Sequence, residues 1–174
     1  MDISRYSSPD GEKYALHKPW RDGEKIVATD GHILIVAGAA LFPDADCSGG
    51  LKYPDYKSVM KFRDFRPFPA DEMSSLLKSA EPREDECAEC NGTGWHWCSC
   101  GNKHDCGGCH GAGKIPRTTS VQIPPAWFDY KYLSLIHDAM IAFPGEWQIS
   151  INGAFEAAGF KREGIEIALM PIRK

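Results

Sequence analysis

Four cysteines in the middle of the chain have the type and spacing of a zinc site. Cys87-Ala-Glu-Cys90-Asn-Gly-Thr-Gly94 is followed by a second copy of the same pattern, Cys106-Gly-Gly-Cys109-His-Gly-Ala-Gly113. Two Cys-x-x-Cys pairs that are fifteen residues apart are typical of structural zinc with four thiolate ligands. We therefore expect Cys87, Cys90, Cys106 and Cys109 to hold one Zn²⁺, whose binding supplies much of the folding free energy of this segment.

A disulfide pair and a redox-active Cys-x-x-Cys are the two other chemistries open to these cysteines. No apolar stretch follows Met1, so we expect a cytoplasmic protein, in which disulfides are rare. A redox dithiol usually occurs once, whereas this motif is duplicated and surrounded by glycine. Zinc is therefore the favoured interpretation, and four thiolates leave no open coordination position for catalysis.

Three further cysteines stand outside this pattern. Cys98 and Cys100, with His96 and His104 beside them, offer donors for a second zinc, although Cys-x-Cys spacing is unusual for ligand pairs. Either of these cysteines could also replace one of the four favoured ligands. Cys47 lies in a stretch with the composition of a loop, and we assign it no role.

The rest of the chain predicts the elements that must position this segment. Residues 26–29 and 32–36 are two β-rich runs joined by Asp30-Gly31, a pair that favours a type I′ hairpin turn. Apolar spacing predicts one helix from near Asp71 to before Pro82 and a second over residues 132–140. Alternation predicts strands at 147–151 and 165–169, with a hairpin turn at Asn152-Gly153. This order favours an α+β fold with a mainly antiparallel sheet and two helices on one face.

Length and composition set the domain organisation. With 174 residues and 43% hydrophobic content, the chain can bury one proper core. We expect one α+β domain from residues 1–80 and 119–174, and a small zinc-binding insertion at 81–118. No run approaches the roughly 18 apolar residues of a membrane span, so we expect a soluble protein with no membrane partner. The net charge of −4 does not indicate nucleic-acid binding. Four cations surround Asp64 in the sequence, and a basic run of this size is usually a solvated face: Lys57, Lys61, Arg63 and Arg66.

Three motifs, in their order along the chain, resemble the bacterial DNA sliding clamp, the β subunit of DNA polymerase III. They are Val27-Ala-Thr-Asp-Gly-His32 with Leu34, then Tyr53-Pro-Asp-Tyr56-Lys-Ser-Val59, and finally Ala168-Leu-Met-Pro-Ile-Arg173. Tyr132-Leu133 and residues 145–153 are similar to the helix and strands that precede the clamp's terminal motif. The resemblance covers about half of the chain. It implies one clamp-like domain and a non-enzymatic role in replication or repair.

The resemblance also implies binding partners. Clamp domains form a ring around duplex DNA, and a surface pocket binds short peptides of polymerases and repair proteins. In this sequence one wall of the pocket would be Thr29, Gly31, His32 and Leu34, and the other Met170, Pro171, Ile172 and Arg173. Ile33 and Lys174 depart from the clamp pattern, in which a basic and an apolar residue are usual. A ring of one-domain chains requires head-to-tail assembly, so the resemblance implies a homo-oligomer.

Two alternatives remain open. The expected helices offer phosphate groups only a few cations, Lys78 and Lys131 with His137, so a clamp relative that does not encircle DNA is one of them. The other is a zinc-stabilised adaptor that presents Trp95 and Trp97 to a protein or to single-stranded nucleic acid; the simpler expectation is that both tryptophans cover the small zinc core. We do not expect an enzyme, because the sequence has no nucleophile elbow, phosphate-binding glycine loop or open metal site.

Overall fold

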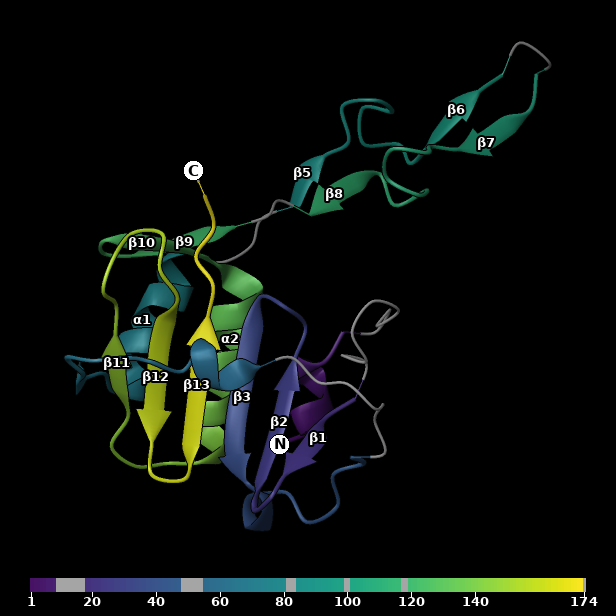
Figure 1. Ribbon diagram of the computed structural model, residues 1–174. Coiled ribbons are helices and arrows are strands. Elements are labelled where there is room, and N and C mark those ends of the chain that lie inside the picture. Colours follow the sequence, from purple (N-terminus) through teal and green to yellow (C-terminus); the bar gives the residue numbers. More distant parts are fainter. Residues whose placement is uncertain (9–17, 48–54, 81–83, 99–100, 117–118, 174) are drawn as a thin grey trace. The chain divides into compact units, whose positions relative to one another are not determined.

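The computed structural model describes residues 1–8, 18–47, 55–80, 84–98, 101–116 and 119–173 (Figure 1). The chain divides into two compact units: unit 1 consists of Met1–Ser79 and Ser120–Lys174, and unit 2 of Ala80–Thr119. Unit 1 contains the large sheet and both α-helices, and unit 2 contains the four cysteines of the repeated motif. Within the described ranges, no helix is long and apolar enough to cross a membrane.

Unit 1 is built on a seven-stranded antiparallel sheet with the order β1-β2-β3-β13-β12-β11-β4. Its strands are β1 (Trp20–Asp22), β2 (Lys25–Thr29), β3 (Ile33–Gly38), β4 (Arg66–Pro67), β11 (Gln148–Ser150), β12 (Ala158–Arg162) and β13 (Ile165–Leu169). The central pair joins β3 to β13, with Ile35 opposite Ile167. Segments from the two ends of the chain therefore complete one sheet, and unit 2 is an insertion between them.

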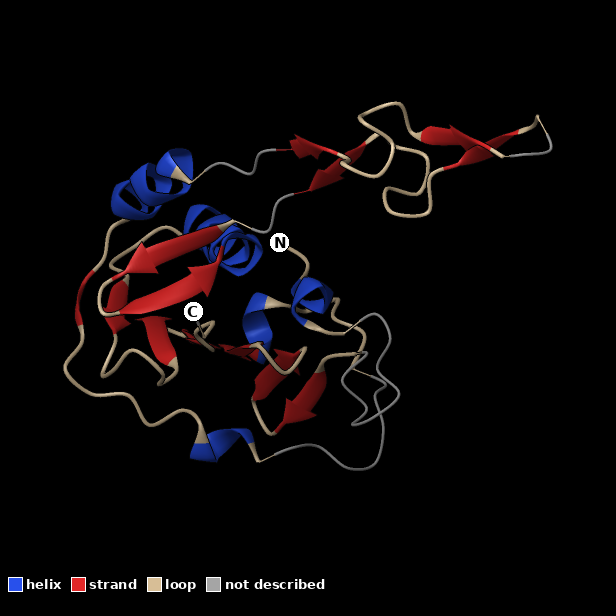
Figure 2. Cartoon of the chain, turned by 90° about the horizontal axis from the view of Figure 1, so that it is seen from above, coloured by secondary structure: helices blue, strands red, loops and turns tan. Residues whose placement is uncertain are grey.

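Two helices, α1 (Ala70–Ser79) and α2 (Tyr130–Ala142), lie on one face of this sheet (Figures 1 and 2). The sheet presents a row of buried side chains that crosses five strands: Ala28, Ile35, Ile167, Phe160 and Ile149. The helices bury their apolar positions, among them Met73, Leu77, Leu133, Ile136 and Met140. The predicted α+β class, with two helices on a mainly antiparallel sheet, is confirmed.

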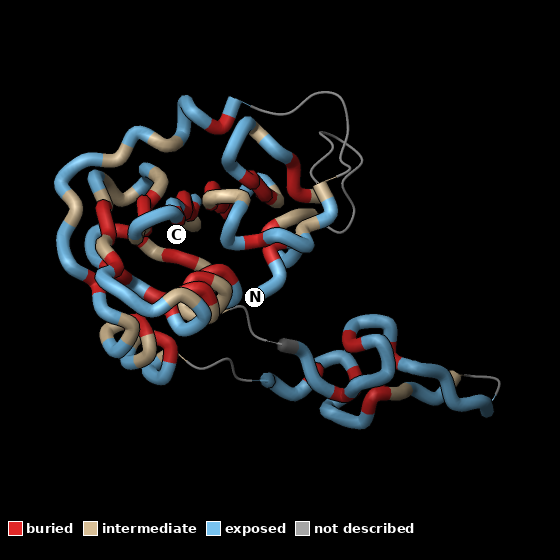
Figure 3. The backbone as a smooth tube through the Cα atoms, turned by 90° about the horizontal axis from the view of Figure 1, so that it is seen from below, coloured by how far each residue is buried: buried red, intermediate tan, exposed pale blue. Residues whose placement is uncertain are grey.

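The strap, as we call residues 55–67, covers part of the other face of the sheet. It begins with the short helix η3 (Tyr56–Ser58) and ends in β4. The Tyr56 hydroxyl donates to Asp22 at 2.6 Å, and the Ser150 hydroxyl donates to the carbonyl of Arg63. Because the central strands are covered on both faces, β2 and β3 are buried along most of their length (Figure 3).

Smaller elements complete unit 1. A separate hairpin is formed by β9 (Ser120–Ile123) and β10 (Ala126–Asp129), and its turn contains a cis bond between Pro124 and Pro125. Two further 3₁₀-helices are η1 (Ile3–Tyr6) and η2 (Ala39–Leu41). Beyond β13, the amide of Ile172 donates to the carbonyl of Trp127 at 2.8 Å, which ties the end of the described chain to β10.

The predicted turn between β2 and β3 is shifted by one residue. Thr29 pairs with Leu34, so Gly31 and His32 are the two turn residues, and the positive φ (+92°) falls on Gly31. Glycine with positive φ at the first central position is typical of a type II′ turn, not of the expected type I′. The cause is Asp30, whose Oδ1 accepts hydrogen bonds from the amides of His32 and Ile33 and so occupies the position before the turn.

The sequence prediction missed β12. Residues 151–157 form a longer connection where Asn152-Gly153 was expected to make a tight turn, and the strand that follows is Ala158–Arg162. The sequence gives a weak strand signal here because Gly159 lies within the strand, and glycine is uncommon in strand interiors. It is needed there because a Cβ atom would lie 2.4 Å from the ring of Phe62 in the strap.

Unit 2 consists of two short antiparallel ladders and the cysteine segments next to them. One ladder pairs β5 (Glu84–Glu86) with β8 (Lys114–Pro116), and the other pairs β6 (Trp95–Trp97) with β7 (Lys103–Asp105). Apart from the cysteines, few side chains of this unit are buried. Its order must therefore come from something other than a hydrophobic core.

Candidate metal centre and apolar groove

The four cysteines of the repeated motif lie together in unit 2. Cys87 Sγ is 3.8 Å from Cys106 Sγ, Cys90 Sγ is 3.8 Å from Cys109 Sγ, and all four sulfur atoms lie within 4.8 Å of one another. A tetrahedral zinc ion with Zn–S bonds of about 2.3 Å requires sulfur atoms about 3.8 Å apart. All four cysteines are buried. The arrangement is thus compatible with a metal ion held by four thiolates.

We call residues 87–94 and 106–113 the two knuckles. Each contains one Cys-x-x-Cys pair and the glycines that follow it, and the two repeat the same hydrogen bonds. In the first knuckle, Gly92 N donates to the Cys87 carbonyl at 3.1 Å and Gly94 N donates to Cys90 Sγ at 3.2 Å. The second knuckle has the equivalent bonds, both at 3.1 Å, from Gly111 to Cys106 and from Gly113 to Cys109. Amide donors to sulfur stabilise thiolates, so each knuckle prepares one of its ligands for the ion.

Glycine at the end of each motif lets the knuckles touch. A Cβ atom on Gly94 (φ +82°) would lie 2.3 Å from the carbonyl oxygen of Gly111, and one on Gly113 (φ +75°) would lie 2.3 Å from that of Gly92. At this interface Cys106 N donates to Gly94 O at 2.8 Å and Cys87 N donates to Gly113 O at 2.9 Å. The glycine spacing in the sequence therefore serves the contact between the knuckles as well as each turn.

Burial and hydrogen bonding act in opposite directions on these thiols. Burial raises the pKa of Cys106 to about 12. For Cys90, burial also opposes ionisation, but the amide of Gly94 and the neighbouring thiols outweigh it and lower the pKa to about 7. Four buried thiolates would repel one another, and a divalent ion supplies the positive charge that makes the fully ionised cluster favourable.

The other cysteines and histidines are arranged differently. Cys98 is disulfide-bonded, so it offers no thiolate for the second zinc that the sequence left open, and Cys100 lies outside the described residues. His96 and His104 are exposed and directly opposite each other in the β6–β7 ladder. Cys47 is a half-buried free thiol.

The two tryptophans of unit 2 differ in exposure. Trp95 is half-buried, and its ring packs edge-on against that of Trp97 with centroids 5.5 Å apart. Trp97 itself is 65% exposed. The expectation that both tryptophans cover the zinc core is therefore wrong for Trp97, whose side chain on the β6–β7 hairpin stays exposed among the residues that the structure describes.

A mostly apolar groove of about 260 Å³ lies in unit 1, where the β2–β3 turn, the strap and the end of β13 meet. All four residues predicted for its first wall line it: Thr29, Gly31, His32 and Leu34. Met170 lines the other side, whereas Pro171, Ile172 and Arg173 are not among the lining residues. After Met170 the backbone is drawn toward β10 by the bond from Ile172. The sequence reasoning missed Tyr56, Val59 and Ala168, although all three belong to the motifs of the resemblance.

The first wall of the groove is held in place by hydrogen bonds. The Thr29 hydroxyl donates to the Ile33 carbonyl at 2.7 Å, and the Tyr132 hydroxyl donates to Asp30 Oδ2 at 2.7 Å. The ring of Tyr132 stacks on that of His32, with centroids 5.9 Å apart. Met170 N donates to the His32 carbonyl at 2.8 Å and joins the two walls. The groove is therefore held in shape by contacts between the chain's own residues.

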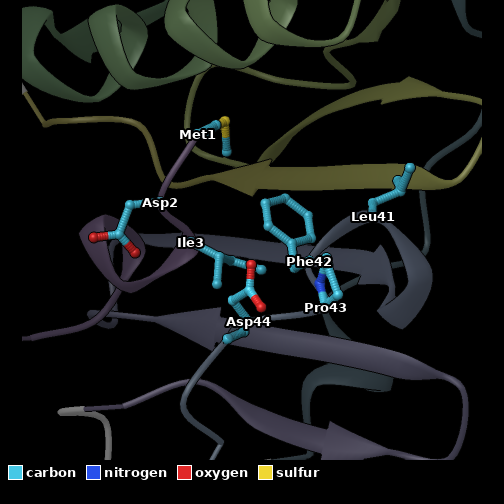
Figure 4. A pocket seen from close by; sticks show the side chains of 8 residues that line it. Met1, Asp2, Ile3, Leu41, Phe42, Pro43 and Asp44 are labelled. Atoms are coloured by element: carbon cyan, nitrogen blue, oxygen red, sulfur yellow. The ribbon is translucent and has the colours of Figure 1, made fainter.

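A larger cavity, of about 390 Å³, lies between the N-terminal segment and residues 41–45 (Figure 4). Its acidic lining residues are Asp2 and Asp44. Asp2 Oδ1 already accepts the amide of Ser4 and caps η1. The cavity contains no pair of acid and base and no residue of the three motifs, so the groove is the better candidate for a binding site.

Solved structures similar to this chain are bacterial sliding clamps. No protein-family model matches the sequence, and no curated protein matches it significantly. The DNA polymerase III subunit β of Pseudomonas aeruginosa matches 98% of the chain with a TM-score of 0.58 and 11% identity. The clamps of Thermotoga maritima (98% of the chain, TM-score 0.56, 13% identity) and Caulobacter crescentus (99%, 0.54, 15%) are similar.

These comparisons establish a clamp-like fold. The matched region spans 61 to 62% of each of these three clamp chains, less than two thirds of their length. At 11 to 15% identity the likeness concerns the fold alone.

Proposed function

We propose that unit 1 is a non-enzymatic, clamp-type platform that binds short peptide segments of replication or repair proteins in the groove. The observation that carries this proposal is the convergence of three sequence motifs, distant along the chain, on one preformed apolar groove in a clamp-like fold. Peptide grooves typically combine apolar walls with a few polar contacts. The lining has this composition: it includes apolar residues such as Leu34 and Ala168, and its polar members are Thr29, His32, Asp55 and Tyr56.

The exposed apolar residues that line the groove indicate which kind of peptide the groove would bind. Val59 on the strap is 42% exposed and Met170 is 44% exposed, and both line the groove. Covering them with an apolar side chain of the ligand removes surface from water on both partners. A cavity of about 260 Å³ has room for one or two large side chains, so we expect a short segment with paired apolar anchors.

Peptide selection with a matched pair of variants tests this function. A displayed library of octapeptides should yield sequences with two large apolar residues when screened against the metal-loaded protein. Val59→Asp should abolish their binding, because it places a charge in the groove. Ile141→Asp, at a residue that is 63% exposed near the end of α2, should bind as wild type does. Equal binding by both variants, or no enrichment, would refute the proposal.

The strap is the part of unit 1 that we propose for contact with DNA. Lys61 and Arg63 are exposed, and neither has an ion-pair partner among the residues that the structure describes. Lys161 on β12 lies 3.8 Å from the centroid of the Phe65 ring and adds a third cation. The helices offer less positive charge than the strap, since α1 carries Lys78 and α2 carries Lys131. Charge therefore favours the strap as the contact to phosphates.

Assembly into a homo-oligomer is a further part of the proposal. The sheet of unit 1 is open, with β1 at one edge and β4 at the other. Head-to-tail pairing of these edges between copies would continue the sheet and could close a ring. Light scattering on the metal-loaded protein measures the number of copies, and a strict monomer at all concentrations would exclude encirclement of DNA by this chain alone.

The metal of the four-cysteine site is proposed to be a structural Zn²⁺ bound by Cys87, Cys90, Cys106 and Cys109. Cysteine thiolates in a tetrahedron are the donor set that zinc prefers in structural sites. The sulfur spacing of 3.8 Å supports this choice. Elemental analysis of purified protein should find zinc, and protein that is folded in unit 2 without any metal would refute the assignment.

An adaptor role for unit 2 is the second candidate, because Trp97 is 65% exposed. An exposed indole on a hairpin can stack on a base or fill a pocket of a partner protein. Trp97→Ala should then reduce binding to single-stranded oligonucleotides or to a captured partner without changing metal content. Unchanged binding of both would leave the groove of unit 1 as the functional site.

A further inference from the structure

The β6–β7 hairpin of unit 2 carries two exposed histidines that the four-cysteine site does not use. His96 and His104 are directly opposite each other across the antiparallel ladder. Side chains at directly opposed positions point to the same face, with Cβ atoms about 4.5–5.5 Å apart. Two imidazoles at this separation can both reach one ion between them.

The two faces of the hairpin have different chemistry. Alternation along β6 and β7 places Trp95, Trp97 and Lys103 on one face, and the contacts agree: the two indoles touch, and Lys103 Nζ lies 4.1 Å from the centroid of the Trp95 ring. The opposite face has His96 and His104, followed along the chain by Cys106. The imidazoles are therefore separated from the aromatic face and lie on the side of the knuckles.

Glu89 of the first knuckle supplies a third donor. A carboxylate oxygen of Glu89, a ring nitrogen of His96 and Cys106 Sγ all lie within 4.8 Å of one another. The carboxylate rests over Gly108, where a Cβ atom would lie 2.5 Å from Glu89 Oε2. Cys106 is fully buried and belongs to the four-sulfur cluster. His104 is not part of this close group, but it lies directly opposite His96 in the ladder. The donors for a second ion are therefore Glu89 and His96, together with His104 once its exposed side chain rotates toward them.

We propose that His96, His104 and Glu89 form a second, exposed site for a divalent transition metal, with water in the remaining positions. Two imidazoles and one carboxylate suit Zn²⁺, Co²⁺, Ni²⁺ or Cu²⁺ and do not suit Mg²⁺ or Ca²⁺, which prefer oxygen donors. The hairpin is held by backbone bonds at both ends, from Cys106 N to Gly94 O at 2.8 Å and from Cys98 N to Asn102 O at 3.0 Å. The ligands thus start from a fixed scaffold.

Cobalt binding to the full-length protein, loaded with only one equivalent of zinc, tests this site. Zinc keeps the four-sulfur site filled, so added Co²⁺ should bind as one further equivalent with weak visible bands and no sulfur-to-cobalt charge transfer. His96→Gln and His104→Gln should each weaken this binding by about 10- to 100-fold or more. Glu89→Gln should weaken it less, because the two imidazoles remain.

The chain offers a matched control at His110. This histidine is exposed and has φ +49°, and the equivalent residue of the first knuckle is Asn91, also with φ +49°. His110→Asn therefore copies a residue that the fold already accepts there, and it should keep the second equivalent.

Each other outcome would overturn the proposal. No second equivalent in the wild type, or a second equivalent that survives in the His96→Gln, His104→Gln double variant, would show that the ion is not bound there. Sulfur-to-cobalt charge-transfer bands would assign the ion to a thiolate instead. The zinc content of every variant, expected at one equivalent, shows that unit 2 has folded.

Discussion

Replacing Gly94 with alanine should separate the two knuckles and weaken metal binding. The new Cβ atom would lie 2.3 Å from the carbonyl oxygen of Gly111, and an ordinary contact requires at least 3.4 Å. The knuckles must then move apart by about 1 Å, the difference between these two distances. Since the same knuckles hold sulfur atoms 3.8 Å apart, the tetrahedron cannot keep its size.

The expected loss of zinc affinity in Gly94→Ala has two causes, backbone strain and overpacking, and a control substitution at Gly101 distinguishes them. Alanine at positive φ costs about 1–2 kcal/mol, and overpacking costs about a further 1–3 kcal/mol. Gly94→Ala should therefore weaken zinc binding by about 30- to 5,000-fold. Gly101 has nearly the same φ, +79°, but a Cβ atom there meets nothing within 4 Å. Gly101→Ala should therefore suffer at most the backbone strain. Because folding of this unit and metal binding are coupled, this strain should weaken zinc binding by about 5- to 30-fold.

Competition with a chromophoric chelator measures both zinc dissociation constants under the same conditions. Gly113→Ala should behave like Gly94→Ala, because its Cβ atom would lie 2.3 Å from Gly92 O. If Gly94→Ala and Gly101→Ala bound zinc equally well, the contact between the knuckles would not support the site, and this reasoning would be wrong.

Three further results are expected. Gly159→Ala should lower the free energy of unfolding of unit 1, measured in urea, by about 1–3 kcal/mol. Adding Phe62→Ala to this variant should recover part of the loss, because it removes the ring that the new Cβ atom would meet. If the second substitution recovers nothing, the loss does not come from contact with Phe62. Burial and the bond to Asp30 raise the pKa of Tyr132, so the stabilisation that Tyr132 gives the folded state should be complete below pH 10, its pKa in the unfolded chain, and should decline as the pH rises above 10. Tyr132→Phe should lower the free energy of unfolding by about 1–2 kcal/mol at neutral pH and make its fall at alkaline pH less steep. If the variant shows the same alkaline fall, Tyr132 does not cause it. Chelation of the metal should abolish amide protection in unit 2 and preserve it in the sheet core of unit 1, as hydrogen exchange can measure, whereas protected amides in metal-free unit 2 would show that the metal does not order it.

Local patterns in the sequence were sufficient for the features that depend on neighbouring residues. The spacing of Met73 and Leu77 predicted α1, and the repeated cysteine motif predicted the cluster of four sulfur atoms. Both follow from periodicity or motif spacing over a few residues. The four residues proposed for the first wall of the groove are also close in sequence, at the β2–β3 turn, and all of them line the groove.

Features that depend on distant residues could not be read in the same way. Gly159 looks like a strand breaker until the ring of Phe62 is placed against it from the strap. The second wall of the groove was expected from Met170 to Arg173. The bond from Ile172 to Trp127 draws the segment after Met170 toward β10, and Tyr56 and Val59 line the groove with Met170. Tertiary contacts therefore overrode the local pattern at Gly159 and the expectation from the resemblance at the second wall.

The pairing of β3 with β13 has a consequence for the order of folding. Paired residues of these strands are 128 to 136 residues apart in the sequence, and during synthesis the ribosome must release β13 before the centre of the sheet can form. The contacts that order unit 2 lie within 40 residues, a much shorter loop to close. The cysteine segment can therefore fold on the nascent chain, with the ion proposed for it, while β2 and β3 still lack their partner. Once folded, this compact insertion shortens the loop that must close when β13 pairs with β3.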